Sequence, residues 1–342
     1  MTRRTTVAAS FVVIIVCVIG TAVSAPNFNQ AKVEQFQRLP QIVESPSNPM
    51  SPARVALGKA LFFDPRLSGS QSMSCASCHN PSLGWSDGLP TAIGQGMSKL
   101  RRATPTIVNS AYGSVFMWDG RKHSLEDQAL GPIQAKDEMN MDMTILLERL
   151  STIKGYREMF DHAYPGEGIT PDAIAKAIAS FERTVVSTNT PFDRWRRGEQ
   201  RAVSDAAKRG FELFLGKADC VACHQGFNFT DEGFHNIGVK TVDGMKDDDG
   251  RYEQLKLRGM KGAFKTPTLR EVALTAPYMH NGIYTTLEEV VDHYDRGGDV
   301  KDNLDISMRP LKLSTQEKID LVEFMKTLTS ERLEFAVPRL PQ

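Results

Sequence analysis

The sequence predicts an all-α protein that contains two domains of common plan. Helix-start signals recur along its 342 residues, and no run of alternating polar and apolar residues predicts a sheet. Residues 104–128 also align without gaps with residues 266–290, and eight of the 25 positions are identical. With a boundary in the polar stretch that begins near residue 187, we expect an N-terminal domain over 26–190 and a C-terminal domain over 191–342.

Each expected helix begins at a residue that caps helices well. A capping side chain accepts a hydrogen bond from a backbone N–H that has no partner within the helix. Proline at the first helical position, as at Pro52 and Pro171, costs no hydrogen bond there. The expected caps are Ser51, Ser124, Thr170, Ser204, Thr286 and Ser314, the last two with Glu289 and Glu317 completing a capping box. Residues 243–262 are polar and Gly-rich, and we expect a loop there.

The first 25 residues predict an export signal. Arg3 and Arg4 precede an apolar stretch that ends in small residues at Ala25. We expect cleavage there and a periplasmic location, although Pro26 suits a cleavage site poorly and leaves a retained membrane anchor as the alternative. The whole chain has 41 basic and 41 acidic side chains and a pI near 7.1, which argues against nucleic acid or a membrane surface as its partner.

Four of the five cysteines lie in two CxxCH motifs. At this spacing two thiols add to the vinyl groups of a haem, and the imidazole that follows binds the iron. A redox dithiol or a zinc site is the alternative, but neither accounts for a histidine in both motifs. We therefore expect two covalently attached haems c, haem 1 at Cys75, Cys78 and His79 and haem 2 at Cys220, Cys223 and His224.

The repeat predicts that the two haems differ on their distal sides. The helix that follows Thr286 places Tyr294 on its apolar side and His293 on its polar side. The position equivalent to Tyr294 in the first domain is Pro132, which offers iron no ligand. We expect the Tyr294 phenolate to close haem 2 and haem 1 to remain open to a small oxidant. A core tyrosine with a satisfied hydroxyl is the alternative for Tyr294.

Three further side chains are candidates for peroxide chemistry at the open haem. Gln128 lies on the apolar stripe of its helix, and Glu138 follows ten residues later. Peroxide cleavage needs one group that moves a proton, which suits Glu138, and one that orients the peroxide, which suits Gln128. Trp118 occupies the repeat position of His280, so we expect it beside a haem as an electron relay. The alternatives are a solvated Glu138 and a Trp118 that only packs in a core.

Several motifs occur in one order: "LGKALFFDPRLSG", CxxCH, "TPTIVN", "WDGR", "LEDQALGP", "KTPTLREVALTAPYMHNG" and "YDRGG". Over about residues 50–330 the chain resembles the bacterial di-haem cytochrome c peroxidase and MauG family. The resemblance implies two cytochrome c-like domains, a peroxide-reactive haem 1, an intervening tryptophan at Trp118, and a distal glutamine and glutamate at Gln128 and Glu138. It also implies that the distal ligand of haem 2, tyrosine in the MauG-like branch and methionine in the peroxidases, is Tyr294, with Met308 as the fallback.

The sequence departs from the peroxidases of this family in two places. Those enzymes often cap the iron of haem 1 with a histidine from the loop before the first Thr-Pro-Thr, whereas residues 80–122 contain no histidine and Gln95 stands near that position. The resemblance further implies a calcium ion between the domains, held partly by the backbone carbonyls of Thr275 and Pro277. Ala103 stands where the family would supply an asparagine ligand for that ion.

These observations together predict a MauG-like enzyme. An anionic phenolate stabilises high oxidation states of haem iron, whereas methionine raises the reduction potential. We expect hydrogen peroxide to react at haem 1 and the two oxidising equivalents, shared with haem 2 through Trp118, to oxidise a partner protein. The alternatives are a peroxidase that takes electrons from a small cytochrome c or a cupredoxin, and a non-enzymatic di-haem electron-transfer cytochrome.

Overall fold

The structure is a computed structural model that describes residues 35–36, 40–42, 44–331 and 335–342. The expected export signal over residues 1–25 lies outside the described residues. Within them, no helix is long and apolar enough to cross a lipid bilayer.

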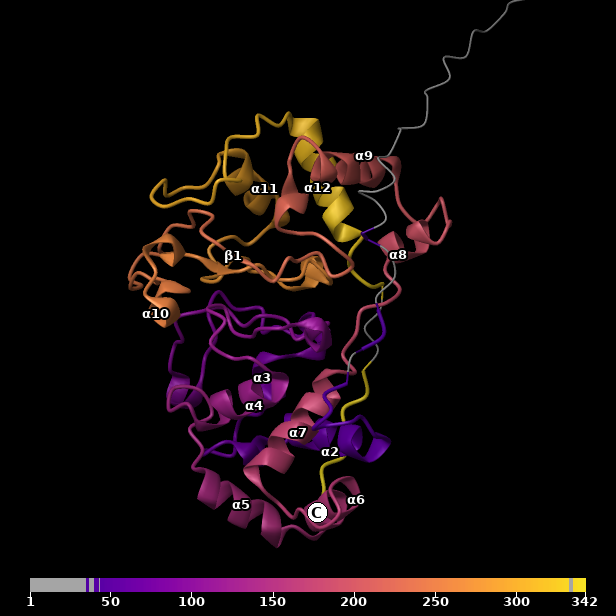
Figure 1. Ribbon diagram of the computed structural model, residues 1–342, viewed down its shortest axis with the longest axis vertical. Helices are drawn as coiled ribbons and strands as arrows, with labels where there is room; N and C mark the ends of the chain where they lie inside the picture. The colour runs from indigo at the N-terminus through magenta and orange to yellow at the C-terminus, as the bar shows by residue number, and fades with distance from the viewer. Residues whose placement is uncertain (1–34, 37–39, 43, 332–334) are drawn as a thin grey trace, which may run out of the picture.

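Two helical bodies lie one above the other along the long axis of the molecule (Figure 1). The first contains α2 (Pro52–Phe63), α3 (Cys75–Cys78), α4 (Leu125–Gln134), α5 (Met143–Thr152), α6 (Lys154–Ala163) and α7 (Pro171–Glu182). The second contains α8 (Pro191–Arg196), α9 (Asp205–Leu215), α10 (Tyr252–Leu255), α11 (Leu287–Asp295) and α12 (Thr315–Lys326). Within each body, short 3-10 helices lie in the connecting segments, at Pro65–Leu67, Pro81–Leu83, Gln95–Met97, Ser110–Tyr112, Cys220–Ala222, Arg258–Met260 and Val272–Leu274.

The all-α prediction is confirmed. The sheet that the described residues form consists of β1 (Phe234–His235) and β2 (Phe264–Lys265), a two-residue antiparallel pair. All six expected capping residues stand at the N-caps of their helices, and Thr286 and Ser314 form the expected capping boxes.

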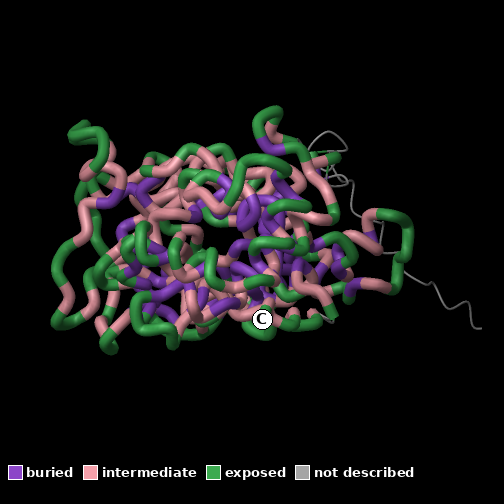
Figure 2. Tube along the Cα trace, turned by 90° about the horizontal axis from the view of Figure 1, so that it is seen from below, coloured by how far each residue is buried: buried purple, intermediate pink, exposed green. Residues whose placement is uncertain are grey.

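Each body has its own apolar core, built around one close helix pair. In the first body α2 packs on α7, and a Cβ at Gly58 would lie 1.8 Å from the Ala177 carbonyl oxygen. In the second body α9 packs on α12, and a Cβ at Gly210 would lie 1.9 Å from the Asp320 carbonyl oxygen. Glycine therefore permits the same close crossing twice. The buried residues of both cores lie inside a shell of exposed chain (Figure 2).

Two segments near the ends of the described chain cross to the opposite body. Phe36 lies in the second core, with its ring centroid 4.9 Å from that of Phe229. Phe335 lies against the first core, stacked on Phe63 at 5.2 Å. From there the chain runs down the first body to its end beside α6 (Figure 1), where the Gly155 N–H donates to the Gln342 carbonyl at 3.0 Å. Each core therefore includes residues from the far end of the sequence.

The internal repeat is visible in the contact between the bodies. The Ala103 N–H donates to the His280 carbonyl at 2.7 Å, and the Lys265 N–H donates to the Trp118 carbonyl at 2.9 Å. Residues 103 and 265, like residues 118 and 280, are 162 positions apart, so each bond is the repeat of the other. Such reciprocal contacts are those of a two-fold interface. The two bodies thus face each other about an approximate two-fold axis beside Trp118 and His280.

The segment expected to be a polar loop, residues 243–262, contains α10 and packs against the first body. Arg251 Nη1 donates to the carbonyls of Asp119 and Gly120 at 2.7 and 2.8 Å. Arg102 also joins the bodies, because its guanidinium binds both Asp119 and Asp248. These contacts use charged side chains distant in sequence, which a local pattern does not reveal.

Candidate haem sites

A cavity of about 460 Å³ surrounds the first CxxCH motif, and we call it the haem 1 cavity. The predicted residues that line it are Cys75, Cys78, His79, Trp118, Gln128, Pro132 and Glu138. The Nδ1 atom of His79 lies 3.1 Å from the Trp85 carbonyl oxygen. That hydrogen bond fixes the tautomer of the ring and leaves Nε2 to bind a metal.

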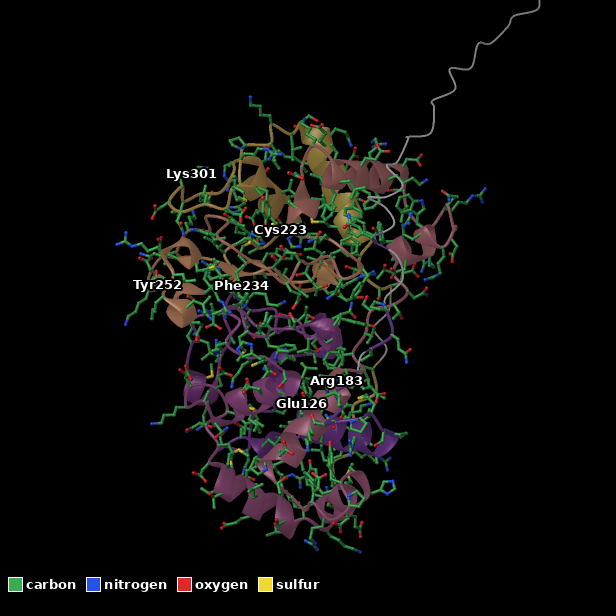
Figure 3. The ribbon with its side chains drawn as sticks, in the orientation of Figure 1. Glu126, Arg183, Cys223, Phe234, Tyr252 and Lys301 are labelled. Atoms are coloured by element: carbon green, nitrogen blue, oxygen red, sulfur yellow. The ribbon has the colours of Figure 1, made fainter. Side chains whose placement is uncertain are left out.

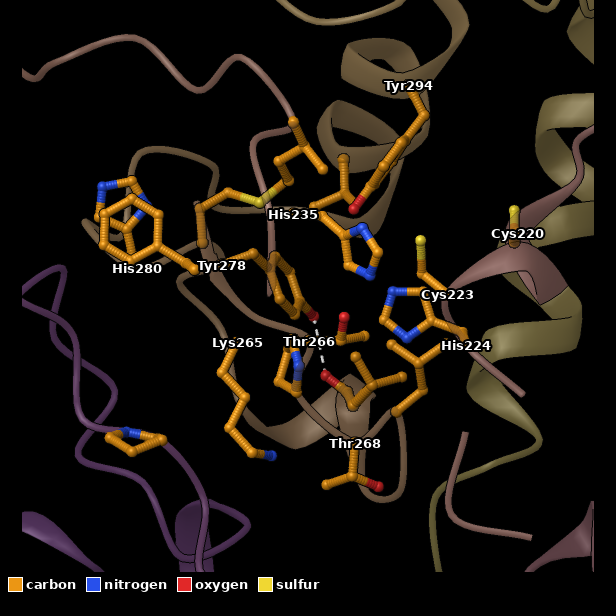
Figure 4. A pocket seen from close by; sticks show the side chains of 18 of the residues that line it. Cys220, Cys223, His224, His235, Lys265, Thr266, Thr268, Tyr278, His280 and Tyr294 are labelled. Carbon is orange, nitrogen blue, oxygen red and sulfur yellow. Dashed lines mark hydrogen bonds between the residues drawn. The ribbon is translucent and has the colours of Figure 1, made fainter. Parts of the chain in front are cut away.

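A second cavity, of about 320 Å³, surrounds the other CxxCH motif, and we call it the haem 2 cavity. The predicted residues that line it are Cys220, Cys223, His224, Thr275, Pro277, Tyr294 and Met308, and Figure 4 shows His224, Tyr294 and the two cysteines converging on it. His224 repeats the arrangement of His79, because its Nδ1 atom lies 2.9 Å from the Phe229 carbonyl oxygen. Trp85 and Phe229 both have positive φ angles, of 62° and 52°, which turn these carbonyls toward the histidines.

The chemistry of both cavities fits a covalently bound haem. None of the four cysteines forms a disulfide, so two thiols and one imidazole face each cavity. Cavities of several hundred cubic ångströms are far larger than a single ion and suit an organic cofactor. Burial also raises the pKa of the Cys78 thiol to about 11 and that of Cys220 to about 12, so both side chains are protonated thiols when no metal is bound. The size of the cavities and the histidine beside each thiol pair favour haem over zinc.

The distal side of the haem 1 cavity is formed by α4 and the turn that follows it. Arg183 binds both carboxylate oxygens of Glu126, at 2.8 and 3.1 Å, and so fastens α4 to the end of α7 (Figure 3). Gln128 and Pro132 lie further along α4 and line the cavity. Desolvation raises the pKa of Glu138 above its usual range, followed by the charge of Asp137. A carboxyl group poised in this way suits proton transfer.

The loop that carries Gln95 supports Glu138 from outside the cavity. The Gln95 N–H donates to the Glu138 carbonyl at 2.8 Å, and the Gln95 side chain accepts from the Ser70 N–H at 3.3 Å. A Cβ at Gly94 would lie 1.8 Å from the Asp137 carbonyl oxygen, so glycine allows the loop to sit this close. Gln95 does not line the haem 1 cavity.

Tyr294 points into the haem 2 cavity from α11 (Figure 4). Burial raises the pKa of its phenol above the usual value, and the nearby Cys220 and Cys223 raise it further. The hydroxyl therefore ionises only if a bound metal ion replaces its proton. Met308 lines the same cavity, so the structure leaves both candidate ligands beside haem 2.

The expected position of His293 was wrong. It is fully buried rather than on the polar side of α11. Its Nε2 atom hydrogen bonds to the Ile237 carbonyl at 2.9 Å, and its Nδ1 atom to the Tyr284 hydroxyl at 2.9 Å. Helical periodicity did not reveal the burial of His293, because Ile237, which binds it, lies 56 residues away in the sequence.

Trp118 stands between the two cavities and lines both of them. Its Nε1–H donates to the Ala103 carbonyl at 2.9 Å, and its ring meets that of His280 edge-on at 6.5 Å between centroids. His280 in turn stacks on Phe264 at 3.6 Å. Trp118 is therefore in contact with both cavities, and its role as an electron relay stays a prediction.

Comparisons with known proteins agree with this geometry. Residues 52–201 match the di-haem cytochrome c peroxidase family model. The methylamine utilization protein MauG of Methylorubrum extorquens is 48% identical over 308 residues, which are 90% of this chain and 87% of that protein. MauG of Methylophilus methylotrophus is 41% identical and covers 96% of this chain and 98% of its own. The crystal structure of a MauG-like protein associated with microbial copper homeostasis superposes with a TM-score of 0.80, at 33% identity, over 86% of this chain and 95% of its own.

The chain belongs to the di-haem cytochrome c peroxidase and MauG family. As a member it is a haem peroxidase-type oxidoreductase that acts on hydrogen peroxide and carries two haems.

One group in this di-haem enzyme was missed by the sequence reasoning. His235 lines the haem 2 cavity, and its two ring nitrogens hydrogen bond to Asp231 at 2.8 Å and to Asp305 at 2.6 Å. Asp231 foremost, then Cys223 and Asp305, raise the pKa of His235 well above its usual value, which favours the charged form of the ring. Asp231 lies one helical turn away in sequence spacing, but Asp305 is 70 residues distant, and no local motif joins the three.

The side chains give little support to the calcium site that the family resemblance implies. Ala103 offers no side-chain oxygen, and its backbone N–H and carbonyl already bind His280 and Trp118. Thr275 and Pro277 line the haem 2 cavity. Calcium, a hard cation, prefers six to eight oxygen ligands. The calcium site stays a prediction that rests on backbone carbonyls alone.

Proposed function

We propose that this protein is a periplasmic, MauG-like enzyme that uses hydrogen peroxide at haem 1 to oxidise residues of a partner protein. The observation that carries the proposal is the contrast between Pro132 and Tyr294 at equivalent ends of α4 and α11. Proline leaves the distal side of haem 1 without a protein ligand, whereas a phenol faces haem 2. A site open to peroxide and a site suited to store oxidising equivalents thus share one molecule.

Glu138 and Gln128 carry out the proton transfer and the orientation of peroxide. The Glu138 carboxylate takes a proton from the bound oxygen of hydrogen peroxide and returns it to the oxygen that leaves as water. The Gln128 amide holds the peroxide in line for this transfer. Its raised pKa brings Glu138 closer to neutral pH, where a group both accepts and donates protons readily. The bound haem supplies the electrons that cleave the O–O bond.

Trp118 connects haem 1 to haem 2, because it lines both cavities. Reduction of one hydrogen peroxide to two waters consumes two electrons and two protons. We infer that both electrons finally come from side chains of a partner protein, which reaches the enzyme at its surface and reduces it in one-electron steps.

A cytochrome c peroxidase that takes electrons from a small cytochrome c or a cupredoxin is the second candidate. It is favoured by Met308, which lines the haem 2 cavity and would raise the potential of haem 2 if it replaced Tyr294 as ligand. A non-enzymatic electron carrier is disfavoured, since the family acts on hydrogen peroxide.

The test is the reaction of the diferric protein with hydrogen peroxide, followed by optical and EPR spectroscopy, in wild type and in Tyr294→Met. We expect rapid loss of both ferric signals to a persistent oxidised state, and a shorter lifetime of that state in the variant. A diferric protein that stays inert until it is half reduced, and then oxidises a cytochrome c catalytically, would favour the second candidate instead.

A further inference from the structure

Trp85 and Phe229 occupy equivalent places behind the two proximal histidines. Each accepts a hydrogen bond from the Nδ1 atom of its histidine through its backbone carbonyl, and each has a positive φ angle. Each side chain is almost completely buried, with 4% of Trp85 and none of Phe229 exposed. The backbone arrangement is therefore the same at both haems. The side chain differs: an indole stands behind haem 1 and a phenyl ring behind haem 2.

This difference matters because indole loses an electron far more readily than a phenyl ring. Trp85 is linked to His79 by the hydrogen bond at its own carbonyl, so a short path of bonds leads from the iron ligand to the indole. Haem 2 has the same path, but it ends on a ring that is hard to oxidise. Peroxide reacts at haem 1, so the oxidisable ring lies at the haem where oxidising equivalents arise.

The surroundings of Trp85 would keep an oxidising equivalent on it. Four phenylalanine rings lie within 6.4 Å of its ring centroid, and Phe335 is the nearest, at 4.9 Å. All four are harder to oxidise than indole and would not pass the equivalent on. Among the described residues the Trp85 Nε1–H has no hydrogen-bond acceptor, whereas that of Trp118 donates to Ala103. No protein group among the described residues is therefore placed to take the N–H proton from an oxidised Trp85.

We propose that Trp85 is a second redox-active residue of haem 1. It gives one electron to haem 1 after peroxide has reacted there and holds the resulting oxidising equivalent as an indole cation radical. One electron moves from the indole to the haem, no bond forms or breaks, and the N–H proton stays in place. A later electron from the reductant restores the indole. This inference rests on the proposed reaction of peroxide at haem 1.

Trp85→Phe is a suitable test, because it places behind His79 the same phenyl side chain that Phe229 places behind His224. The hydrogen bond to His79 comes from the backbone and survives the change. Trp195→Phe is the matched control, since it makes the same chemical change in the core of the second body. Trp85→Tyr is a rescue variant that keeps an oxidisable ring at the site.

The experiment is freeze-quench EPR after one equivalent of hydrogen peroxide, on holoprotein made with ring-deuterated tryptophan. We expect wild type to show a radical signal that deuteration alters. The signal should be retained in Trp195→Phe, lost in Trp85→Phe and replaced by a tyrosyl signal in Trp85→Tyr. Peptide mapping of wild type after excess peroxide, which needs no variant, should find oxygen added at Trp85 before Trp195.

Two outcomes would overturn the inference about Trp85, and only the second would also contradict the proposed function. If the optical spectrum of haem 1 changes while no deuterium-sensitive signal forms, or the signal persists in Trp85→Phe, Trp85 is not redox-active and the proposed function stands. If the spectrum of haem 1 does not change at all, both proposals fail.

Discussion

The two haem sites differ in a few side chains on a common backbone. Both place a CxxCH motif against a residue of positive φ angle whose carbonyl binds the proximal histidine, and both place a capped helix over the other side. At the equivalent end of that helix, Pro132 stands in one site and Tyr294 in the other. Between the sites, Trp118 in one repeat faces His280 in the other.

This comparison teaches that a duplicated scaffold acquires two functions through the residues that face its cofactors. The backbone hydrogen bonds that orient His79 and His224 are retained, because both haems need an oriented imidazole. Pro132 and Tyr294 differ, as the proposed function requires if one haem admits peroxide and the other does not. The predictions that follow test this difference, beginning with the largest expected effect.

A haem closed by a protein ligand does not need an acid that transfers protons to peroxide. Removal of the Glu138 carboxylate should therefore affect only the reaction with hydrogen peroxide. We expect Glu138→Gln to slow the loss of the ferric haem 1 signal by about 10²- to 10⁴-fold, the range for general acid–base catalysis. Stopped-flow mixing with hydrogen peroxide measures this rate. In wild type the rate should fall as pH drops through the raised pKa of Glu138, because the protonated acid accepts no proton.

Asp137→Asn is the control, since Asp137 is the neighbouring acid whose charge contributes to the raised pKa of Glu138. It should change the rate far less than Glu138→Gln. Similar rates in wild type and Glu138→Gln would remove Glu138 from the proposed mechanism.

The crossed ends allow the two cores to be weakened separately. Phe36 is 1% exposed, and Phe36→Ala should lower the free energy of unfolding of the second body by about 3–5 kcal/mol. Phe335 is less completely buried, and Phe335→Ala should cost the first body about 1.5–3 kcal/mol. Urea unfolding followed at each haem separately distinguishes the two. Equal loss at both haems in each variant would mean that the bodies unfold as one unit.

Buried acids are compensated differently in the two bodies. Glu271 accepts hydrogen bonds from Ser187 and Ser330. Glu182, in the wall of the haem 1 cavity, has a buried Oε2 atom with no hydrogen-bond partner among the described residues, because the adjacent Arg183 binds Glu126 instead. Burial raises the pKa of Glu182 to about 8. An acid with a raised pKa in the folded state costs stability as pH rises above its unfolded value.

Glu182→Gln should therefore stabilise the protein relative to wild type more at pH 8 than at pH 5, by at most about 1.4 kcal/mol per pH unit. Thermal unfolding at both pH values measures the difference. Glu126→Gln provides the opposite case, because it leaves Arg183 without its partner and should destabilise. A pH-independent effect of Glu182→Gln would mean that Glu182 is ionised in the folded protein.

Removal of the phenol should make the two sites alike. In Tyr294→Phe the reduced protein should bind two carbon monoxide molecules instead of one, because haem 2 loses its distal ligand. Optical titration counts the bound ligand. Retention of a single binding site would indicate that Met308, which lines the same cavity, ligates haem 2.

The sequence was sufficient for the features that depend on neighbours along the chain. Helix caps, the two CxxCH motifs and the repeat are local patterns, and the structure has the capped helices and brings the motif residues to the two cavities. What could not be predicted depends on distant partners. His293 is buried by Ile237, and the pKa of His235 is raised partly by Asp305, and neither pairing leaves a periodic signal. The crossing of Phe36 and Phe335 is likewise a property of the closed tertiary structure.

That crossing sets an order for biosynthesis. Phe335 follows every helix of the second body in the sequence, so the first core lacks one of its rings until the second body has been synthesised. The second core, by contrast, receives Phe36 from a segment made early. The N-terminal body, although synthesised first, is thus completed last, and its CxxCH motif has the longest time in an unfinished chain in which haem attachment can take place.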